Sequence, residues 1–122
     1  MKIGKLGMGL IGLALVAMTG CQSAAKPQGD SWSAIEDRGK LVVGIDDKFA
    51  PMGFRDENNE LAGYDIEMAK AVSEKLGIAF EFQTIDWSMK ESELNAGNID
   101  LIWNGYSITD TRKQQVAFSE PY

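Results

Sequence analysis

Histidine is absent from the 122 residues of the chain, and cysteine occurs only once, as Cys21. Without histidine, a histidine-based catalytic triad, a histidine general base and most zinc sites are excluded. A single cysteine forms no disulfide within the chain. The acidic residues are scattered over expected helices and loops, which is typical of a solvated surface. Enzymes that use only carboxylates stay open, but no pattern indicates a paired acid and base. We therefore expect no enzyme activity, no metal site and no cofactor.

Basic residues are also scarce. The chain has 12 Lys and Arg residues against 18 Asp and Glu, a net charge of −6. If an N-terminal leader containing Lys2 and Lys5 is removed, 10 basic residues remain against 18 acidic ones, a net charge of −8. Nucleic acids and anionic lipid headgroups both require a basic surface. We therefore expect neither of them to be a binding partner.

The first residues have the pattern of an export signal. Lys2 and Lys5 precede a run from Leu6 to Met18 that is almost wholly apolar. This run is shorter than the roughly 20 residues that span a bilayer, but it suits the apolar core of a secretory signal. The sequence predicts a signal peptide over residues 1–20 and a folded part that lies outside the cytoplasm.

The signal ends at a motif that resembles the lipobox of bacterial lipoproteins. Its residues are Met18-Thr19-Gly20-Cys21, with Met18 where leucine is usual. The resemblance implies that Cys21 becomes a diacylated N-terminus, and two fatty chains anchor a protein on the cell membrane far better than one. The small polar residues 21–31 would then form a flexible tether. An ordinary signal peptide with an incidental cysteine is the alternative.

Strand patterns recur after Trp32. Continuous apolar runs at Leu41–Ile45 and 99–103 predict strands that are buried on both faces. Alternation of apolar and other residues over 78–83 predicts a half-buried strand, and a polar run inside 53–63 predicts a hairpin.

Helices are expected between these strands. Capping boxes beginning at Ser33 and Ser88 predict two helix starts, and Asp65 is predicted to cap a third helix. The third helix has an apolar face made of Ile66, Ala69, Val72 and Leu76. Short strands joined by helical crossovers imply an α/β fold with a mostly parallel sheet covered by helices. Ligands in such folds bind at the carboxyl ends of the strands.

The strongest functional pattern lies between Trp103 and Arg112. An apolar strand leads into a glycine turn, and Thr109 is placed to cap a helix that carries Arg112. Exposed backbone N–H groups, a helix start and a guanidinium together favour a small carboxylate ligand. The alternative is a strand, a turn and a capped helix with a solvated Arg112, and the spacing alone does not separate the two.

Several motifs, in this order, resemble the polar amino-acid binding proteins of bacterial ABC importers. They are Gly39–Gly44, Phe49–Phe54, Gly63–Ala69, Leu76-Gly77, Asp86-Trp87, Leu94–Gly97, Asp100, Thr109–Arg112 and Phe118–Tyr122. The resemblance implies the type II periplasmic-binding-protein-like fold. Residues 32–122 would form the N-terminal part of lobe 1, incomplete at the C-terminus. Because family members have about twice the mature length, we expect a truncated reading frame or a fragment that lacks the second lobe.

The resemblance also implies how the main chain of an amino acid would be bound. Arg112 would bind the α-carboxylate, the Ser107 hydroxyl would contact the ligand backbone, and the Gly105 carbonyl would accept from the α-ammonium group. Asn104 and Tyr106 vary between members and receive no role.

Three further positions would surround the ligand side chain. Phe49 and Trp87 would sandwich its aliphatic part, and Asp46 would reach toward its end, as in glutamine-binding members. Burial in the core is the alternative for the two aromatic residues. Asp46 and the neighbouring Asp47 could equally be solvated turn residues.

The function implied by the resemblance is solute capture for import. A monomeric protein would close around a polar amino acid of the glutamine type and deliver it to the permease subunits without doing chemistry. Losing the hydrogen bonds of a second lobe would cost about 4–8 kcal/mol, so a single lobe should bind poorly. The alternatives are an enzyme of the same fold, either a dehydratase or a transglycosylase with an accessory lobe, and a sensory ligand-binding module.

Overall fold

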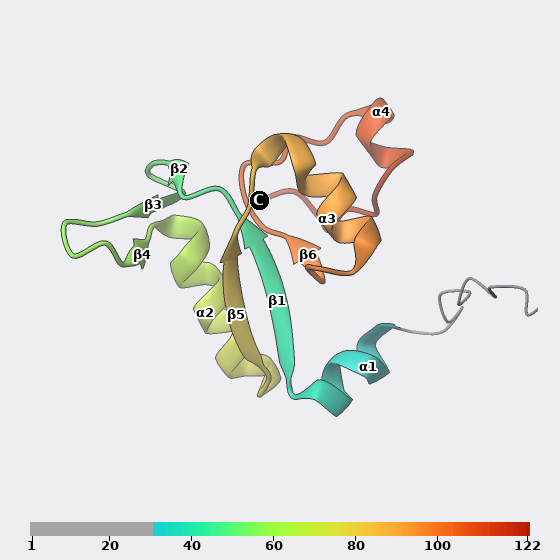
Figure 1. Ribbon diagram of the computed structural model, residues 1–122, viewed down its shortest axis with the longest axis horizontal. Coiled ribbons are helices and arrows are strands. Elements are labelled where there is room, and N and C mark those ends of the chain that lie inside the picture. The colour runs from blue at the N-terminus through green and yellow to red at the C-terminus, as the bar shows by residue number, and fades with distance from the viewer. Residues whose placement is uncertain (1–30) are drawn as a thin grey trace, which may run out of the picture.

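The computed structural model describes residues 31–122, so the expected signal peptide, Cys21 and nearly all of the expected tether lie outside the described residues. Figure 1 shows the arrangement of the elements. The helices are α1 (Ser31–Arg38), α2 (Tyr64–Leu76), α3 (Lys90–Ala96), α4 (Asp110–Lys113) and the 3-10 helix η1 (Trp87–Met89). The strands are β1 (Lys40–Ile45), β2 (Lys48–Phe49), β3 (Gly53–Arg55), β4 (Leu61–Ala62), β5 (Ala79–Thr84) and β6 (Leu101–Ile102).

The main sheet is three-stranded and parallel, in the order β5-β1-β6. The central strand β1 pairs with β5 along its whole length, from Lys40 opposite Ala79 to Ile45 opposite Thr84. On one face of β1, Val43 and Ile45 are 0% and 1% exposed. On the other face, Gly44 is buried against the side chain of Ile99. The prediction of a parallel sheet with a buried central strand is therefore confirmed.

Helices cover this sheet and supply the rest of the core. Helix α2 packs against β5, α1 against β1 and α3 against β6. Ile35 of α1 and Ile66 of α2 join the buried residues of β1 in one apolar cluster. The helices end at Gly39, Gly77 and Gly97, each with a positive φ, as expected for glycine after a helix C-terminus. Within residues 31–122, no helix combines the length and the hydrophobicity needed to cross a membrane.

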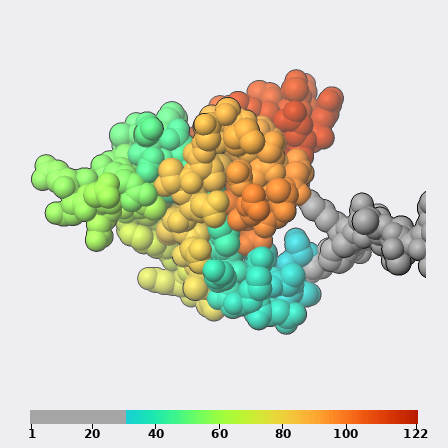
Figure 2. Space-filling model, viewed as in Figure 1, coloured from blue at the N-terminus to red at the C-terminus, as the bar shows by residue number. Residues whose placement is uncertain are grey.

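A second, antiparallel sheet has the order β2-β3-β4. The predicted hairpin over residues 53–63 is confirmed by the β3–β4 pairing, and it projects from one side of the molecule (Figures 1 and 2). Asp56 closes the hairpin, because its carboxylate accepts from the backbone N–H groups of Asn58 and Glu60. The two-residue strand β2 was not predicted, since it is too short to show a period.

The prediction that Asp65 caps α2 is wrong. The helix begins at Tyr64, and its N-cap is Gly63, with φ 122° and no side-chain cap. A side chain at position 63 would collide with the Met52 carbonyl. The first amides of the helix already donate to the carbonyl groups of Pro51 and Met52. Asp65 is instead 1% exposed and lies inside the helix.

Two other predicted boundaries differ from the structure. Ser88 does not cap α3. Its hydroxyl and its amide both donate to the Asp86 carboxylate, which caps η1, and α3 begins only at Lys90. Helix α1 begins at Ser31, the last residue of the expected tether, which places Ser33 inside the helix.

The last predicted strand is also shorter than expected. Strand β6 covers only Leu101–Ile102, although Asp100 and Trp103 continue the backbone hydrogen bonding to β1 on either side.

Candidate functional site

The carboxyl ends of β1, β5 and β6 meet at one edge of the main sheet. The predicted ligand-binding residues all follow these ends: Asp46 and Phe49 follow β1, Trp87 follows β5, and Gly105, Ser107 and Arg112 follow β6. This edge is where parallel α/β sheets bind ligands. The parallel topology therefore directs the segments that carry these residues to the same edge of the sheet, and Figure 1 shows the strands that they follow.

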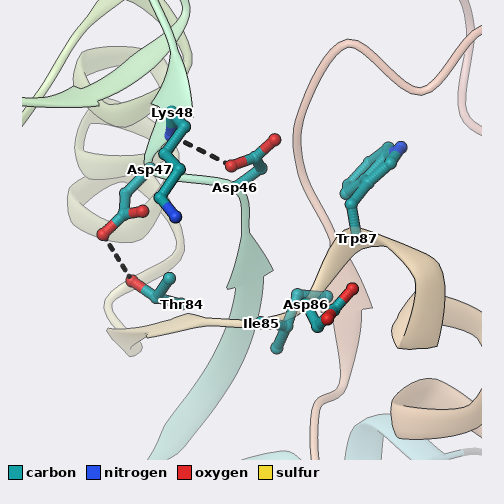
Figure 3. Close-up of a pocket in the computed structure, with 7 residues that line it drawn as sticks. All are labelled: Asp46, Asp47, Lys48, Thr84, Ile85, Asp86 and Trp87. Carbon is teal, nitrogen blue, oxygen red and sulfur yellow. Dashed lines mark hydrogen bonds between the residues drawn. The ribbon is translucent and has the colours of Figure 1, made fainter.

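A pocket of about 430 Å³ opens between the segments that follow β1 and β5. Figure 3 shows its lining residues, with Asp46 and Trp87 on facing sides. The Asp46 carboxylate accepts from the backbone N–H of Lys48 at 2.9 Å. The pocket thus brings together one acidic and one aromatic residue of the predicted site.

Two more carboxylates line the same pocket. A hydrogen bond from Arg55, at 2.7 Å, lowers the pKa of Asp47. Hydrogen bonds from the hydroxyl and the amide of Ser88 lower the pKa of Asp86. Lys48 is the basic residue among the lining residues. The pocket is therefore acidic at neutral pH.

Phe49 and Gly105 lie directly against each other. A Cβ atom built on Gly105 would come within 2.5 Å of Cε1 of the Phe49 ring, so the ring rests on the glycine backbone. Phe49 is 45% exposed. Burial in the core, the alternative for this residue, does not fit that exposure.

Arg112 is held in a defined position. Its Nη1 donates to the Ser107 carbonyl at 2.9 Å, and its guanidinium carbon lies 4.6 Å from the centre of the Tyr106 ring. The predicted cap is confirmed, because the Thr109 hydroxyl accepts from the Arg112 amide at 3.2 Å. Arg112 is therefore bonded within the protein, and its role in binding a ligand carboxylate stays a prediction.

The helix that carries Arg112 is very short. Helix α4 has only 4 residues, so its dipole contributes little. Attraction for an anion at this place depends on the guanidinium, and the expected contribution of the helix start is not supported.

Tyr106, to which the resemblance assigned no role, lies between Trp87 and Arg112. Its ring meets the Trp87 ring edge-on at a centroid distance of 5.6 Å and the Phe118 ring at 5.2 Å. Its hydroxyl donates to the Glu91 carboxylate at 2.6 Å. Burial of the hydroxyl, together with the bond to Glu91, raises the pKa of Tyr106 to about 12, and the same bond lowers the pKa of Glu91. The sequence pointed to Tyr106 in one way alone, because it is an aromatic residue between Gly105 and Ser107, which both had assigned roles.

The end of the chain is tied to α2. The Tyr122 hydroxyl donates to Asp65 Oδ1 at 2.6 Å and accepts from Trp103 Nε1 at 3.0 Å. Tyr122 as a whole is 64% exposed, but its hydroxyl reaches a buried carboxylate. Burial of this end and the bond to Asp65 raise the pKa of Tyr122 to about 12. Asp65 Oδ2 is buried, and no donor within residues 31–122 reaches it.

Comparison with known proteins identifies the family. Residues 41–122 match the bacterial extracellular solute-binding proteins, family 3. The chain belongs to this family. Over its whole length it is 30% identical to the L-cystine-binding protein TcyJ of Escherichia coli (strain K12), of which it covers 47%. The chain thus spans about half the length of this curated relative.

Solved structures agree with this assignment. A substrate-binding protein of an ABC uptake transporter from Streptococcus pneumoniae, with bound histidine, is 51% identical and superposes with a TM-score of 0.74, over 77% of this chain and 38% of that one. A point mutant of the arginine-bound domain 1 of TmArgBP is 38% identical, with a TM-score of 0.71, over 74% of this chain and 70% of that one. These likenesses confirm the periplasmic-binding-protein-like α/β fold.

Proposed function

We propose that the chain belongs to the extracytoplasmic binding component of a bacterial ABC importer, where it captures a polar amino acid for the permease. One observation supports the proposal: Arg112, the exposed Phe49 ring and the acidic pocket all lie in segments that follow the carboxyl ends of the sheet strands, although neither Arg112 nor Phe49 lines the pocket itself. An amino acid has a carboxylate, an apolar stem and, in the polar members, a side chain that such a pocket can recognise. Family membership supports this proposal.

Each predicted residue then has a physical role. Arg112 pairs with the α-carboxylate, because an anion that leaves water requires a charged partner. The Ser107 hydroxyl donates to the ligand backbone, and the Gly105 carbonyl accepts from the α-ammonium group. Phe49 and Trp87 cover the aliphatic stem, and Asp46 meets the polar end of the side chain. No bond of the ligand is made or broken.

Glutamine is the ligand class that the sequence favours, because Asp46 can accept a hydrogen bond from an amide. A cationic side chain is a second candidate. The observation in its favour is the acidic lining of the pocket by Asp46, Asp47 and Asp86. The histidine-bound and arginine-bound relatives support this second candidate, and the cystine-binding relative shows that family members differ in their ligands.

Residues 32–122 are proposed to form the N-terminal part of the first lobe. The arginine-bound domain 1 of TmArgBP, of which the chain covers 70%, supports binding by a first lobe alone. It weighs against our expectation that a lobe without its partner binds poorly. We retain weak binding as the prediction, since the hydrogen bonds of a second lobe would add about 4–8 kcal/mol.

A thermal-shift screen of the full chain with the twenty amino acids, each at a concentration high enough to reveal the weak binding expected of a single lobe, tests the proposal. We expect one or a few polar amino acids to raise the melting temperature and the apolar ones to leave it unchanged. The Asp46→Asn variant separates the two ligand classes, because it should weaken a cationic ligand about tenfold or more and glutamine much less. Asp37→Asn, an exposed acidic residue of α1, is the matched control. If no amino acid changes the melting temperature, the proposal is wrong.

The membrane attachment is proposed on the sequence alone. We propose that residues 1–20 are a signal peptide, that residues 21–31 form a lipidated Cys21 with a tether, and that the protein works as a monomer on the outer side of the cell membrane. Intact-mass measurement of membrane-extracted protein should show a lipid increment on the chain, and Cys21→Ser should remove both the increment and the attachment. A soluble Cys21 protein without added mass would contradict this.

A further inference from the structure

Tyr106 lies between the two side chains that we assign to opposite parts of the ligand. One of its neighbours is the Trp87 ring, at 5.6 Å and nearly perpendicular at 86°. The other is the Arg112 guanidinium, 4.6 Å from the ring centre. A movement of this one ring would therefore move the group for the carboxylate and the group for the aliphatic stem together.

The Tyr106 ring is itself held from helix α3. Its hydroxyl donates to Glu91 Oε1 at 2.6 Å. The same oxygen lies 3.1 Å from the Lys90 ammonium, and the side chains of Lys90 and Glu91 are only 11% and 22% exposed. Lys90 also donates to the Trp87 carbonyl at 3.2 Å and lies over both the Trp87 and the Tyr106 rings. Helix α3 thus fixes the ring through a largely buried, charge-assisted hydrogen bond.

We propose that Glu91 and Tyr106 are positioning residues that set the orientation of Arg112 and Trp87 for the ligand, without touching the ligand themselves. The proposal rests on the proposed function, because it gives Arg112 the α-carboxylate to bind. The route runs from Glu91 in α3, through the Tyr106 hydroxyl and ring, to the guanidinium in α4.

The physical argument starts from the freedom of an arginine side chain. Arg112 has one hydrogen bond that fixes its guanidinium, to the Ser107 carbonyl, and its fork can rotate about that bond. The Tyr106 ring supplies a second surface that restricts this rotation by cation–π attraction. A restricted guanidinium loses less entropy when a carboxylate binds, which increases affinity.

The hydroxyl at position 106 needs an explanation beyond packing. A phenylalanine would fill nearly the same space and would leave no hydroxyl to satisfy. Placing a hydroxyl against a poorly exposed carboxylate is directional, because the oxygen atoms must meet at hydrogen-bond distance. The bond therefore fixes the rotation and the tilt of the ring, which apolar contact with Phe118 does not do.

A double-mutant cycle on the full chain tests the route. The variants are Tyr106→Phe, Glu91→Ala and the combination of the two. Glu93→Ala is the matched control in the same helix, since the Glu93 carboxylate accepts from Asn98. Titration calorimetry with L-glutamine and L-arginine gives the affinities. We expect each single change to weaken binding by about tenfold and the combination to weaken it by about tenfold as well, because the two changes break the same bond.

A second measurement reads the arginine directly. The side-chain Nε–H resonance of Arg112, assigned with Arg112→Lys, should be displaced by the Tyr106 ring current in the ligand-free protein. Tyr106→Leu should abolish this displacement, Glu91→Ala should reduce it, and Glu93→Ala should leave it unchanged. A structural role without positioning would lower the melting temperature and leave the resonance in place.

The outcomes separate the two proposals. If no amino acid binds but the Arg112 resonance responds to Glu91→Ala, the proposed function fails and the positioning route stands. If binding depends on Arg112 while Glu91→Ala changes neither the affinity nor the resonance, the positioning route is overturned. It is also overturned if the fold-loss of affinity in the double variant equals the product of the two single fold-losses. Should Glu91→Ala fail to fold, Glu91→Gln replaces it and must show a smaller loss of the same kind.

Discussion

Strand β1 and the C-terminal segment, residues 104–122, are held in place by different forces. In β1 the side chains of Leu41, Val43 and Ile45 are buried, and the strand pairs on both sides. In the C-terminal segment no residue is buried, and Figure 2 shows it on the outer surface. That segment is held by hydrogen bonds and ring contacts at Tyr106, Arg112 and Tyr122.

The difference separates stability from binding. Apolar burial in β1 supplies free energy of folding but sets no direction in the site. The polar and aromatic contacts of the C-terminal segment add less free energy, but each one orients a group. Changes in β1 should therefore act on the free energy of unfolding, and changes in the C-terminal segment should act mainly on ligand affinity.

The largest expected effect is that of Ile45→Ala. Ile45 is 1% exposed in the centre of the sheet, and removing a buried isoleucine side chain costs about 2–5 kcal/mol. Ile108→Ala in the C-terminal segment is the control, because Ile108 is 38% exposed and should cost less than about 1 kcal/mol. Urea denaturation of both variants measures the two costs. Equal losses of unfolding free energy would show that apolar burial does not distinguish β1 from residues 104–122.

Tyr122→Phe should have the next largest effect, and it sharpens the comparison because Tyr122 is the residue of the segment that reaches a buried group. The change leaves Asp65 Oδ1 without its donor, which should cost about 1–3 kcal/mol of unfolding free energy. Tyr64→Phe is the control, since Tyr64 is 55% exposed. If both variants unfold at the same urea concentration as the unmodified chain, Tyr122 is not an anchor.

The pKa of Tyr122 predicts how this contribution depends on pH. Its folded pKa, about 12, lies above the unfolded value of about 10, so folding favours the protonated hydroxyl. The stabilisation is complete below pH 10 and is lost as the pH rises toward 12. The difference in stability between the unmodified chain and Tyr122→Phe should therefore shrink over this range. A difference that stays constant would contradict the assignment.

Thr109→Ala should have the smallest effect. The Thr109 hydroxyl caps α4, and loss of such a cap costs about 1 kcal/mol. Because α4 carries Arg112, affinity for an amino acid should fall as well, by a few-fold. Thr111→Ala, two residues further along the same helix, should leave both quantities unchanged. Thermal unfolding and titration calorimetry measure the two quantities. Identical results for Thr109→Ala and Thr111→Ala would show that the Thr109 cap contributes to neither stability nor affinity.

Much of the fold could be predicted from the sequence because its signals are local. The apolar run Leu41–Ile45 predicted the central strand, and the glycines at positions 39, 77 and 97 predicted where helices end. The convergence of the site segments at one sheet edge followed from the parallel topology. These features depend on a few neighbouring residues, so a single sequence contains them.

The remaining features depend on distant contacts. Asp65 has the pattern of a helix cap, yet it is buried and bonded to Tyr122, 57 residues away. Tyr106 is central only because Glu91, 15 residues earlier, lies within reach of its hydroxyl. Ser88 was predicted as a cap, but Asp86 takes that role for η1. A local sequence pattern does not predict which of several polar residues will form a hydrogen bond with a residue distant in the sequence.

Calorimetric titration of Arg112→Lys with L-glutamine and L-arginine shows whether Arg112 binds the carboxylate of the ligand. Lysine keeps the positive charge and loses the forked pair of donors. We predict that affinity falls by about 10- to 100-fold, while the unfolding free energy changes by less than about 0.5 kcal/mol. Lys113→Gln, the next residue of α4, should bind as the unmodified chain does. If Arg112→Lys binds an amino acid as tightly as the unmodified chain, the guanidinium is not the carboxylate group's partner and the account is contradicted.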